Sequence, residues 1–253
     1  MYWKTLMKLA AGAAFLASAN GIVYAAPLKV SGAAAVAGSI VMPNKAAIEK
    51  ETGLTLEITV NGDGNGVKDL YAGKVDVAMI AAPMKITEAV LNKANPGSVS
   101  VADFQLAPIG AVSIKFIVNA ANPIKSLTEA QLKDIFLGKT TSWKEIGGAD
   151  QPILIVAEPG GFGTRSNIVE SLLGGAEITD KARTVQALVQ VAQVVAQAPN
   201  AIGYGNNATI KGGATVLPGV EVKQSLGLAT NGAPNADVKK LIEALTKYGS
   251  AIN

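Results

Sequence analysis

Residues 54–80, LTLEITVNGDGNGVKDLYAGKVDVAMI, decide the fold class of this chain. The run 54–60 alternates apolar and polar residues and predicts a half-buried strand, which the glycine-rich loop 61–66 follows. Residues 67–72 then predict an amphipathic helix, and the apolar run 75–80 is typical of a fully buried strand. This order of strand, loop, helix and strand predicts an α/β fold with a largely parallel sheet.

The same alternation continues through the rest of the chain. We expect further strands at 28–31, 114–118, 153–157 and 201–204, and helices at 37–51, 128–136, 185–196 and 237–248. Ligands of open α/β sheets bind beyond the carboxyl ends of the strands. The loops at Gly32, at Asp63 and after Met79 all follow expected strands, so we expect them to converge at one site.

Composition excludes several classes of site. The chain has 253 residues, with no cysteine and no histidine, which rules out disulfides, thiolate nucleophiles, imidazole bases and the usual zinc sites. Its formal net charge is +3, and its Lys, Asp and Glu residues are interspersed rather than gathered into the basic stripe that nucleic-acid binding needs. We expect no metal ion, no cofactor and no nucleic-acid partner.

Residues 1–25 have the features of a cleavable secretory signal. Two lysines supply positive charge, an apolar run covers 9–17, and residues 23–25 (VYA) fit the small-x-small cleavage rule. We expect the mature chain to begin near Ala26 and to be a monomer in the periplasm. An uncleaved membrane anchor is the alternative, although the apolar run is shorter than the roughly 20 residues of a spanning helix.

A second glycine-rich stretch, 158–165 (EPGGFGTR), predicts a loop that runs into the N-terminus of a helix. Such loops bind anions, because the backbone approaches the ligand closely and the positive end of the helix dipole faces it. Glu158 and Phe162, however, place a negative charge and an apolar ring in this loop. The backbone of this loop therefore indicates an anion site, whereas its side chains indicate that the site binds a ligand other than an anion.

Four segments resemble the family of periplasmic phosphate-binding proteins of ABC transporters: 61–83, 126–148 (SLTEAQLKDIFLGKTTSWKEIGG), 161–165 and 200–204 (NAIGY). The resemblance spans most of the mature chain in the right order. It implies a type II periplasmic binding protein, with two lobes that each hold a mixed, largely parallel sheet flanked by helices. These lobes would hinge around a ligand cleft.

The resemblance also suggests how the chain divides into domains. We expect residues 1–25 to be the signal peptide, 26–110 plus 207–253 to form lobe 1, and 111–206 to form lobe 2. The stretches around residues 108–110 and 205–207 would then be the points where the chain crosses between the lobes.

The phosphate ligands of the family carry over onto positions that have changed in this chain. Its Gly-Ser-Thr falls on residues 32–34 (GAA), its second-loop serine on Asp63, and its third-strand Ser-Asp or Ser-Arg pair on 80–82 (IAA). Its arginine and following serine fall on Glu158 and Phe162. The ligand-binding residues that the resemblance implies are Ala33, Ala34, Asp63, Gly64, Ile80, Ala81, Glu158, Phe162, Gly163, Thr164 and Arg165.

These exchanges remove hydroxyl donors and add carboxylates, which disfavours a buried phosphate. We therefore expect a mainly apolar organic ligand with a hydroxyl or amine tip, for example a lipid such as a sterol, held by an apolar wall with few polar groups. The alternative is inorganic phosphate or another oxyanion carried to an ABC importer. In either case the partners are the ligand and the inner-membrane components of a transporter.

Each of these side chains also has a structural interpretation. Asp63 could cap the helix that follows it, Glu158 could turn outward to a lysine, Phe162 could pack in the core, and Arg165 could brace the start of its helix. The loop around Asp63 faintly resembles a calcium loop but lacks the glutamate at position twelve. A carboxylate pair of Glu158 and Asp63 could serve glycoside hydrolysis, but nothing else in the sequence supports an enzyme.

Overall fold

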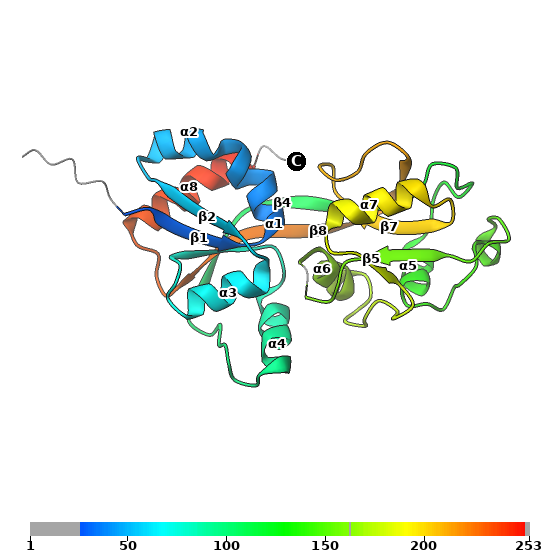
Figure 1. Ribbon diagram of the computed structural model, residues 1–253, viewed down its shortest axis with the longest axis horizontal. Coiled ribbons are helices and arrows are strands. Elements are labelled where there is room, and N and C mark those ends of the chain that lie inside the picture. The colour runs from blue at the N-terminus through cyan, green and yellow to red at the C-terminus, as the bar shows by residue number, and fades with distance from the viewer. Residues whose placement is uncertain (1–25, 162, 251–253) are drawn as a thin grey trace, which may run out of the picture.

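The computed structural model describes residues 26–161 and 163–250, and the expected signal peptide and Phe162 lie outside these described residues. One eight-stranded mixed sheet runs through the molecule, in the order β2-β1-β3-β8-β4-β7-β5-β6. Figure 1 shows two lobes side by side, joined by the long strands β4 and β8. Among the described helices, none is long and apolar enough to cross a membrane.

The left-hand lobe of Figure 1 is built around strands β1 to β3. Its elements are β1 (Leu28–Gly32), α1 (Ala34–Val36), the π-helical turn η1 (Ala37–Val41), α2 (Met42–Thr52), β2 (Leu56–Val60), α3 (Asp63–Tyr71), β3 (Val77–Ile80), α4 (Met84–Ala94) and α8 (Ala236–Gly249). β1 pairs in parallel with both β2 and β3. Helices α2 and α8 lie on one side of these strands and α3 on the other.

The right-hand lobe repeats this plan around strands β5 to β7. Its elements are α5 (Glu129–Phe136), the 3₁₀ turn η2 (Trp143–Ile146), β5 (Leu154–Ala157), α6 (Gly163–Ser171), β6 (Arg183–Thr184), α7 (Leu188–Gln197) and β7 (Ala201–Gly205). β5 pairs in parallel with β6 and β7. Thr128 caps α5 in a capping box with Gln131, because its hydroxyl accepts the N–H of Gln131 at 3.2 Å.

Strands β4 (Phe104–Asn119) and β8 (Ala214–Asn231) connect the lobes as an antiparallel pair. β8 also pairs antiparallel with β3, and β4 with β7, so the parallel strands of each lobe join one continuous sheet. The α/β prediction is confirmed, and the separate sheets that we expected for the two lobes are linked through this central pair. The β4–β8 register shifts between Pro108 and Gly110, close to the crossing between the lobes.

The hydrophobic side chains form separate cores on the two sides of this crossing. Ile109 and Leu226 belong to the core of the first lobe, whereas Ile114 and Val222 belong to that of the second. Leu217 also packs in the second core, so part of the stretch 207–253 that we assigned to lobe 1 packs with lobe 2. The residue boundaries of the lobes stay a prediction. Because Val222 packs in the second core and Leu226 in the first, the second point at which the chain passes between the lobes lies near residues 223–225 rather than 205–207.

The helix after β1 contains a π-helical turn because a proline follows it. α1, η1 and α2 run consecutively from residue 34 to 52, with Pro43 at the start of α2. Proline has no N–H to donate to the preceding turn, and its ring crowds the carbonyl four residues earlier. The wider turn over Ala37–Val41 accommodates both effects.

Gly32 ends β1 at a point that only glycine can occupy. Its φ is +130°, and a Cβ placed on it would lie 2.3 Å from the carbonyl oxygen of Met79 in β3. The backbone turns here into Ala33, whose N–H donates to the same carbonyl at 2.9 Å. The ends of β1 and β3 therefore come together at the cleft, as we expected for the loops at Gly32 and after Met79.

Candidate functional site

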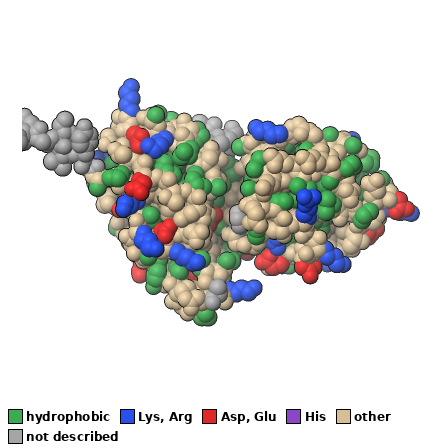
Figure 2. Space-filling view, in the orientation of Figure 1, with side chains coloured by type: hydrophobic (Ala, Val, Ile, Leu, Met, Phe, Trp, Pro, Cys, Tyr) green, Lys and Arg blue, Asp and Glu red, His purple; other side chains and the backbone are tan. Residues whose placement is uncertain are grey.

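Helices α3 and α6 both begin where the two lobes touch, and Figure 2 shows the groove between the lobes in space-filling form. A Cβ placed on Gly163, the first residue of α6, would lie 2.9 Å from Oδ2 of Asp63, the first residue of α3. The same Cβ would lie 3.3 Å from Nε2 of Gln224. The positive ends of two helix dipoles thus meet at one place between the lobes.

Asp63 is buried at this junction and binds the end of β3. Its Oδ1 accepts the N–H groups of Ala81 at 2.6 Å and Ala82 at 2.8 Å, and its residue is 6% exposed. Burial raises the pKa of the Asp63 carboxyl, and these two N–H bonds act in the opposite direction. The N-cap residue of α3 is Gly62, so Asp63 does not take the capping position that we considered for it.

Glu158 lies at the end of β5 and is also buried, at 4% exposure, which contradicts the alternative that it turns outward to a lysine. Its backbone N–H donates to the hydroxyl of Tyr204 at 3.0 Å. Burial, and then the negative charge of Asp63, raise the pKa of Glu158 to about 7, while Arg165 acts against this rise. Within the described residues, its Oε2 has no hydrogen-bond partner.

Arg165 holds the start of the glycine-rich loop through hydrogen bonds to groups of its own lobe, the second one. Its Nη1 donates to the backbone carbonyl of Glu158 at 2.9 Å, and its Nη2 donates to Oε2 of the exposed Glu177 at 3.1 Å and to the carbonyl of Ile178 at 3.4 Å. We had considered Arg165 as a partner for one of the two cleft carboxylates. The hydrogen bonds of its Nη groups instead go to the Glu158 backbone and away from the cleft, whereas its buried Nε has no partner among the described residues.

Two side chains that our sequence reasoning missed bridge the lobes. Nδ2 of Asn167, on α6, donates to the carbonyl of Ala81 at 2.7 Å and to that of Gly163 at 2.7 Å. Nε2 of Gln224, on β8, donates to the carbonyl of Ala81 at 3.2 Å. Gln224 is fully buried, and its Oε1 finds no partner in the part of the chain that the structure describes.

The apolar residues that we expected around the ligand are mostly packed in the core. Ile80 is 2% exposed in a cluster with Val67 and Leu70, and Ala33 and Ala81 belong to the main core of the first lobe. Ala34 is exposed, Gly64 is half-buried and Thr164 is buried. Phe162 lies outside the described residues. Direct contact of these residues with a ligand stays a prediction.

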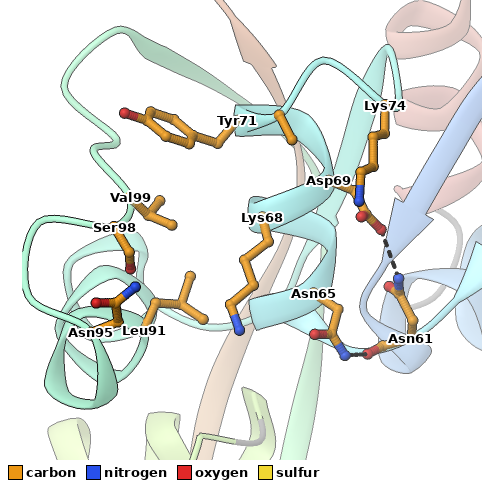
Figure 3. Close-up of a pocket in the computed structure, with 11 residues that line it drawn as sticks. Asn61, Asn65, Lys68, Asp69, Tyr71, Lys74, Leu91, Asn95, Ser98 and Val99 are labelled. Carbon is orange, nitrogen blue, oxygen red and sulfur yellow. Dashed lines mark hydrogen bonds between the residues drawn. The ribbon is translucent and has the colours of Figure 1, made fainter.

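A hollow of about 530 Å³ lies elsewhere, on the first lobe between α3 and the segment after α4 (Figure 3). Lys68 projects across it, and Asp69 accepts a hydrogen bond from Asn61 at 2.9 Å at its rim. The residues that line it are Asn61, Asn65, Lys68, Asp69, Tyr71, Ala72, Lys74, Leu91, Asn95, Ser98 and Val99. None of these is a residue that we expected to bind the ligand.

Two of the curated proteins that are similar to this chain are phosphate-binding proteins by name. The phosphate-binding protein PstS of Bacillus subtilis is 29% identical over 177 residues, which cover 70% of this chain and 56% of that protein. PstS of Staphylococcus epidermidis is 27% identical over 173 residues, covering 67% of this chain and 51% of that protein. This chain therefore spans about half the length of the curated relatives it matches.

Solved structures show the same fold. A putative phosphate ABC transporter substrate-binding protein with bound phosphate, from Clostridium perfringens, has a TM-score of 0.74 and 24% identity, and the match covers 90% of this chain and 96% of that one. An ABC-type phosphate transport receptor from Vibrio cholerae has a TM-score of 0.68 and 20% identity, with 88% and 95% covered. Both support the type II, two-lobed architecture that the sequence predicted.

The family model of the PBP superfamily domain matches residues 25–248, almost the whole chain. None of these similar proteins supports the lipid or sterol ligand that we expected, because their names specify phosphate. The resemblance stated from the sequence is confirmed. This chain belongs to the PBP superfamily.

Proposed function

We propose that this chain is the solute-binding component of an ABC importer and that its lobes close on a small oxyanion, with inorganic phosphate as the first candidate. The observation that carries this proposal is the meeting of the α3 and α6 N-termini between the lobes, at Asp63 and Gly163. The relatives named above add support, since they are phosphate-binding proteins of the same fold.

The donors for such a ligand come mainly from the backbone. The first four N–H groups of a helix have no partner within the helix, and α6 begins with Gly163, Thr164 and Arg165, which keep the family's residue types. Thr164 adds a hydroxyl at a buried position. These groups can bind an oxyanion even though the chain lacks the other serine and threonine donors of the family.

An apolar ligand has less support than an oxyanion. The residues that would form its apolar wall, Ile80 and Ala81 among them, fill the cores of the first lobe. Asn167 and Gln224 bond directly to the Ala81 carbonyl, so the two lobes meet through polar groups. A small polar ligand suits this junction better than a sterol.

The cellular setting follows from the same assignment. We propose that residues 1–25 export the chain, that it acts as a monomer, and that it delivers its ligand to the inner-membrane components of the importer. The two buried carboxyl groups, Asp63 and Glu158, would then serve ligand recognition rather than catalysis.

Equilibrium titration of the purified, phosphate-stripped protein with inorganic phosphate tests this proposal, with sulfate as a second oxyanion. We expect saturable phosphate binding, weakened roughly tenfold or more in Thr164→Val, because a hydrogen bond to a charged group is worth about 1.5–3 kcal/mol. Thr246→Val is the matched control, since Thr246 is exposed on α8. Failure of the unmodified protein to bind phosphate at millimolar concentration would overturn the proposal.

A further inference from the structure

Two carboxyl groups become buried together when the lobes touch. Asp63 belongs to the first lobe and Glu158 to the second, and they are 6% and 4% exposed. The hydrogen bond from Asn167 to the Ala81 carbonyl, at 2.7 Å, spans the same contact. Lobes of this fold hinge apart around their ligands, and that motion would return both carboxyl groups toward water.

Among the described neighbours of Glu158, only Arg165 favours its ionised form, and it compensates that charge only in part. Asp63 faces it from α3 with the same charge, and Tyr204 faces it from β7 with a neutral hydroxyl that already accepts the Glu158 backbone N–H. Arg165 on α6 is the cation nearby, but its Nη groups bond the Glu158 backbone carbonyl and groups outside the cleft. The nearby polar side chain on β8 is Gln224, which is neutral and therefore cannot balance the charge of Glu158. Its own acceptor, Oε1, has no hydrogen-bond partner among the described residues.

A buried carboxylate in such surroundings becomes neutral by taking up a proton. The unpartnered Oε2 of Glu158 is the atom that gains most from protonation, since the resulting O–H can donate a hydrogen bond. In an open cleft the same carboxyl is hydrated and ionised at neutral pH. Closing the lobes therefore changes the number of protons that the protein holds.

We propose that closure of the cleft takes up a proton onto the Glu158 carboxyl, so that ligand capture is coupled to proton uptake. This deepens the proposed function, on which it rests, because the added proton makes an acidic cleft compatible with an anionic ligand. Neutral Glu158 no longer repels Asp63 or the oxyanion, and its O–H becomes a donor where the family has an arginine.

The direction of the pH dependence follows from linkage. The pKa of Glu158 is about 7 in the closed cleft, against its ordinary value of 4.5, so the closed form holds the proton more tightly. Closure is favoured at low pH, loses this advantage as the pH rises from 4.5 to 7, and changes little above 7. Between pH 5.5 and 8 the ratio of closed to open protein should fall about 30-fold.

Lobe closure can be measured without any ligand, by energy transfer between two dyes. The chain has no cysteine, so Lys50→Cys on the first lobe and Ala149→Cys on the second, both exposed, provide unique labelling sites. We expect the distance between the dyes to increase as the pH rises from 4.5 to 7 and to change little above 7, and we expect this increase to be strongly reduced in Glu158→Gln. Glu170→Gln, an exposed carboxyl on α6, is the matched control and should behave as the unmodified protein does.

Calorimetric titration with inorganic phosphate, in two buffers of different ionisation enthalpy, counts the protons taken up on binding. We expect the unmodified protein at pH 6.5 to take up more protons than Glu158→Gln does, which separates the Glu158 proton from any carried by phosphate itself. Equal proton uptake by the unmodified protein and by Glu158→Gln would overturn this inference. A distance between the dyes that does not change with pH would also overturn it. Closure that follows pH in a protein that binds no phosphate would overturn the proposed function alone.

Discussion

Replacing Glu158 by glutamine should stabilise the folded protein at pH 8 and change its stability little at pH 4.5. The pKa of this buried carboxyl rises from 4.5 to about 7 on folding, which means that the folded state disfavours its ionised form. Since one pKa unit corresponds to about 1.4 kcal/mol, ionised Glu158 costs the folded state about 3 kcal/mol. Glutamine has the same shape and never ionises.

The sign of the effect follows from which state holds the proton. Below 4.5 the Glu158 carboxyl is protonated in the folded and the unfolded chain, so the pH has no effect through this group. Between 4.5 and 7 only the folded chain keeps the proton, and its stability falls as the pH rises. Above 7 both states are ionised, and the full cost of about 3 kcal/mol applies as long as the cleft stays closed.

Thermal unfolding followed by circular dichroism at pH 4.5 and pH 8 measures this difference. For a domain of this size, about 3 kcal/mol corresponds to a rise in Tm of roughly 6–12 °C for Glu158→Gln over the unmodified protein at pH 8. Any misfit of the glutamine amide lowers stability equally at both pH values, so the comparison isolates ionisation. If both proteins, and the control Glu170→Gln, lost stability in parallel between the two pH values, the account of Glu158 would be refuted.

Three further substitutions test the junction between the lobes and the packing beside it. Asn167→Ala removes the 2.7 Å bond to the Ala81 carbonyl and should weaken phosphate binding roughly fivefold to tenfold, measured by calorimetric titration; unchanged affinity would show that this bond does not hold the cleft closed. Gly163→Ala places a methyl group 2.9 Å from Oδ2 of Asp63, which is too close for the lobes to meet as they do, so affinity should fall; undiminished affinity would contradict the contact. Trp143→Phe loses a buried N–H bond of 2.9 Å and should lower the unfolding free energy by about 1–2 kcal/mol in urea without changing affinity, whereas an affinity loss would place Trp143 in the site.

Short elements with regular patterns could be predicted from the sequence. The strand expected at 28–31 is β1 (Leu28–Gly32), and the helix expected at 128–136 is α5 (Glu129–Phe136), because each has a clear periodicity and a local start or stop signal. The strand expected at 114–118 is only the last part of the 16-residue β4. Helix α4, which carries no capping side chain, was not predicted.

The long central strands β4 and β8 could not be predicted at their full length, because their sequences contain residues typical of turns. Pro108 lies inside β4, and Pro218 followed by Gly219 lies inside β8, whose Gly219 has a φ of +92°. Proline and glycine normally end a strand or mark a bulge, and pairing along the partner strand overrides that local preference here. β8 also changes from alternating to continuous burial as it passes between the lobes, so no single period describes it.

The residues of the candidate site also fall into a group that could be predicted from the sequence and a group that could not. Asp63, Glu158 and Gly163 could be placed from the resemblance, since they stand at positions of known loops in the family. Asn167 and Gln224 could not, because a polar residue in a helix or an alternating strand predicts solvent exposure. Their burial depends on the contact of the second lobe with the Ala81 carbonyl, which only the folded chain forms.

Calorimetric titration of the phosphate-stripped protein with inorganic phosphate at pH 6, where Glu158 is protonated in the closed cleft, tests directly whether an oxyanion binds between the lobes. We expect one phosphate per chain, bound in the micromolar range or tighter, with binding weakened by Gly163→Ala at the junction of α3 and α6. Absence of binding at millimolar phosphate, or equal binding by the Gly163→Ala protein, would contradict an oxyanion site between these two helices.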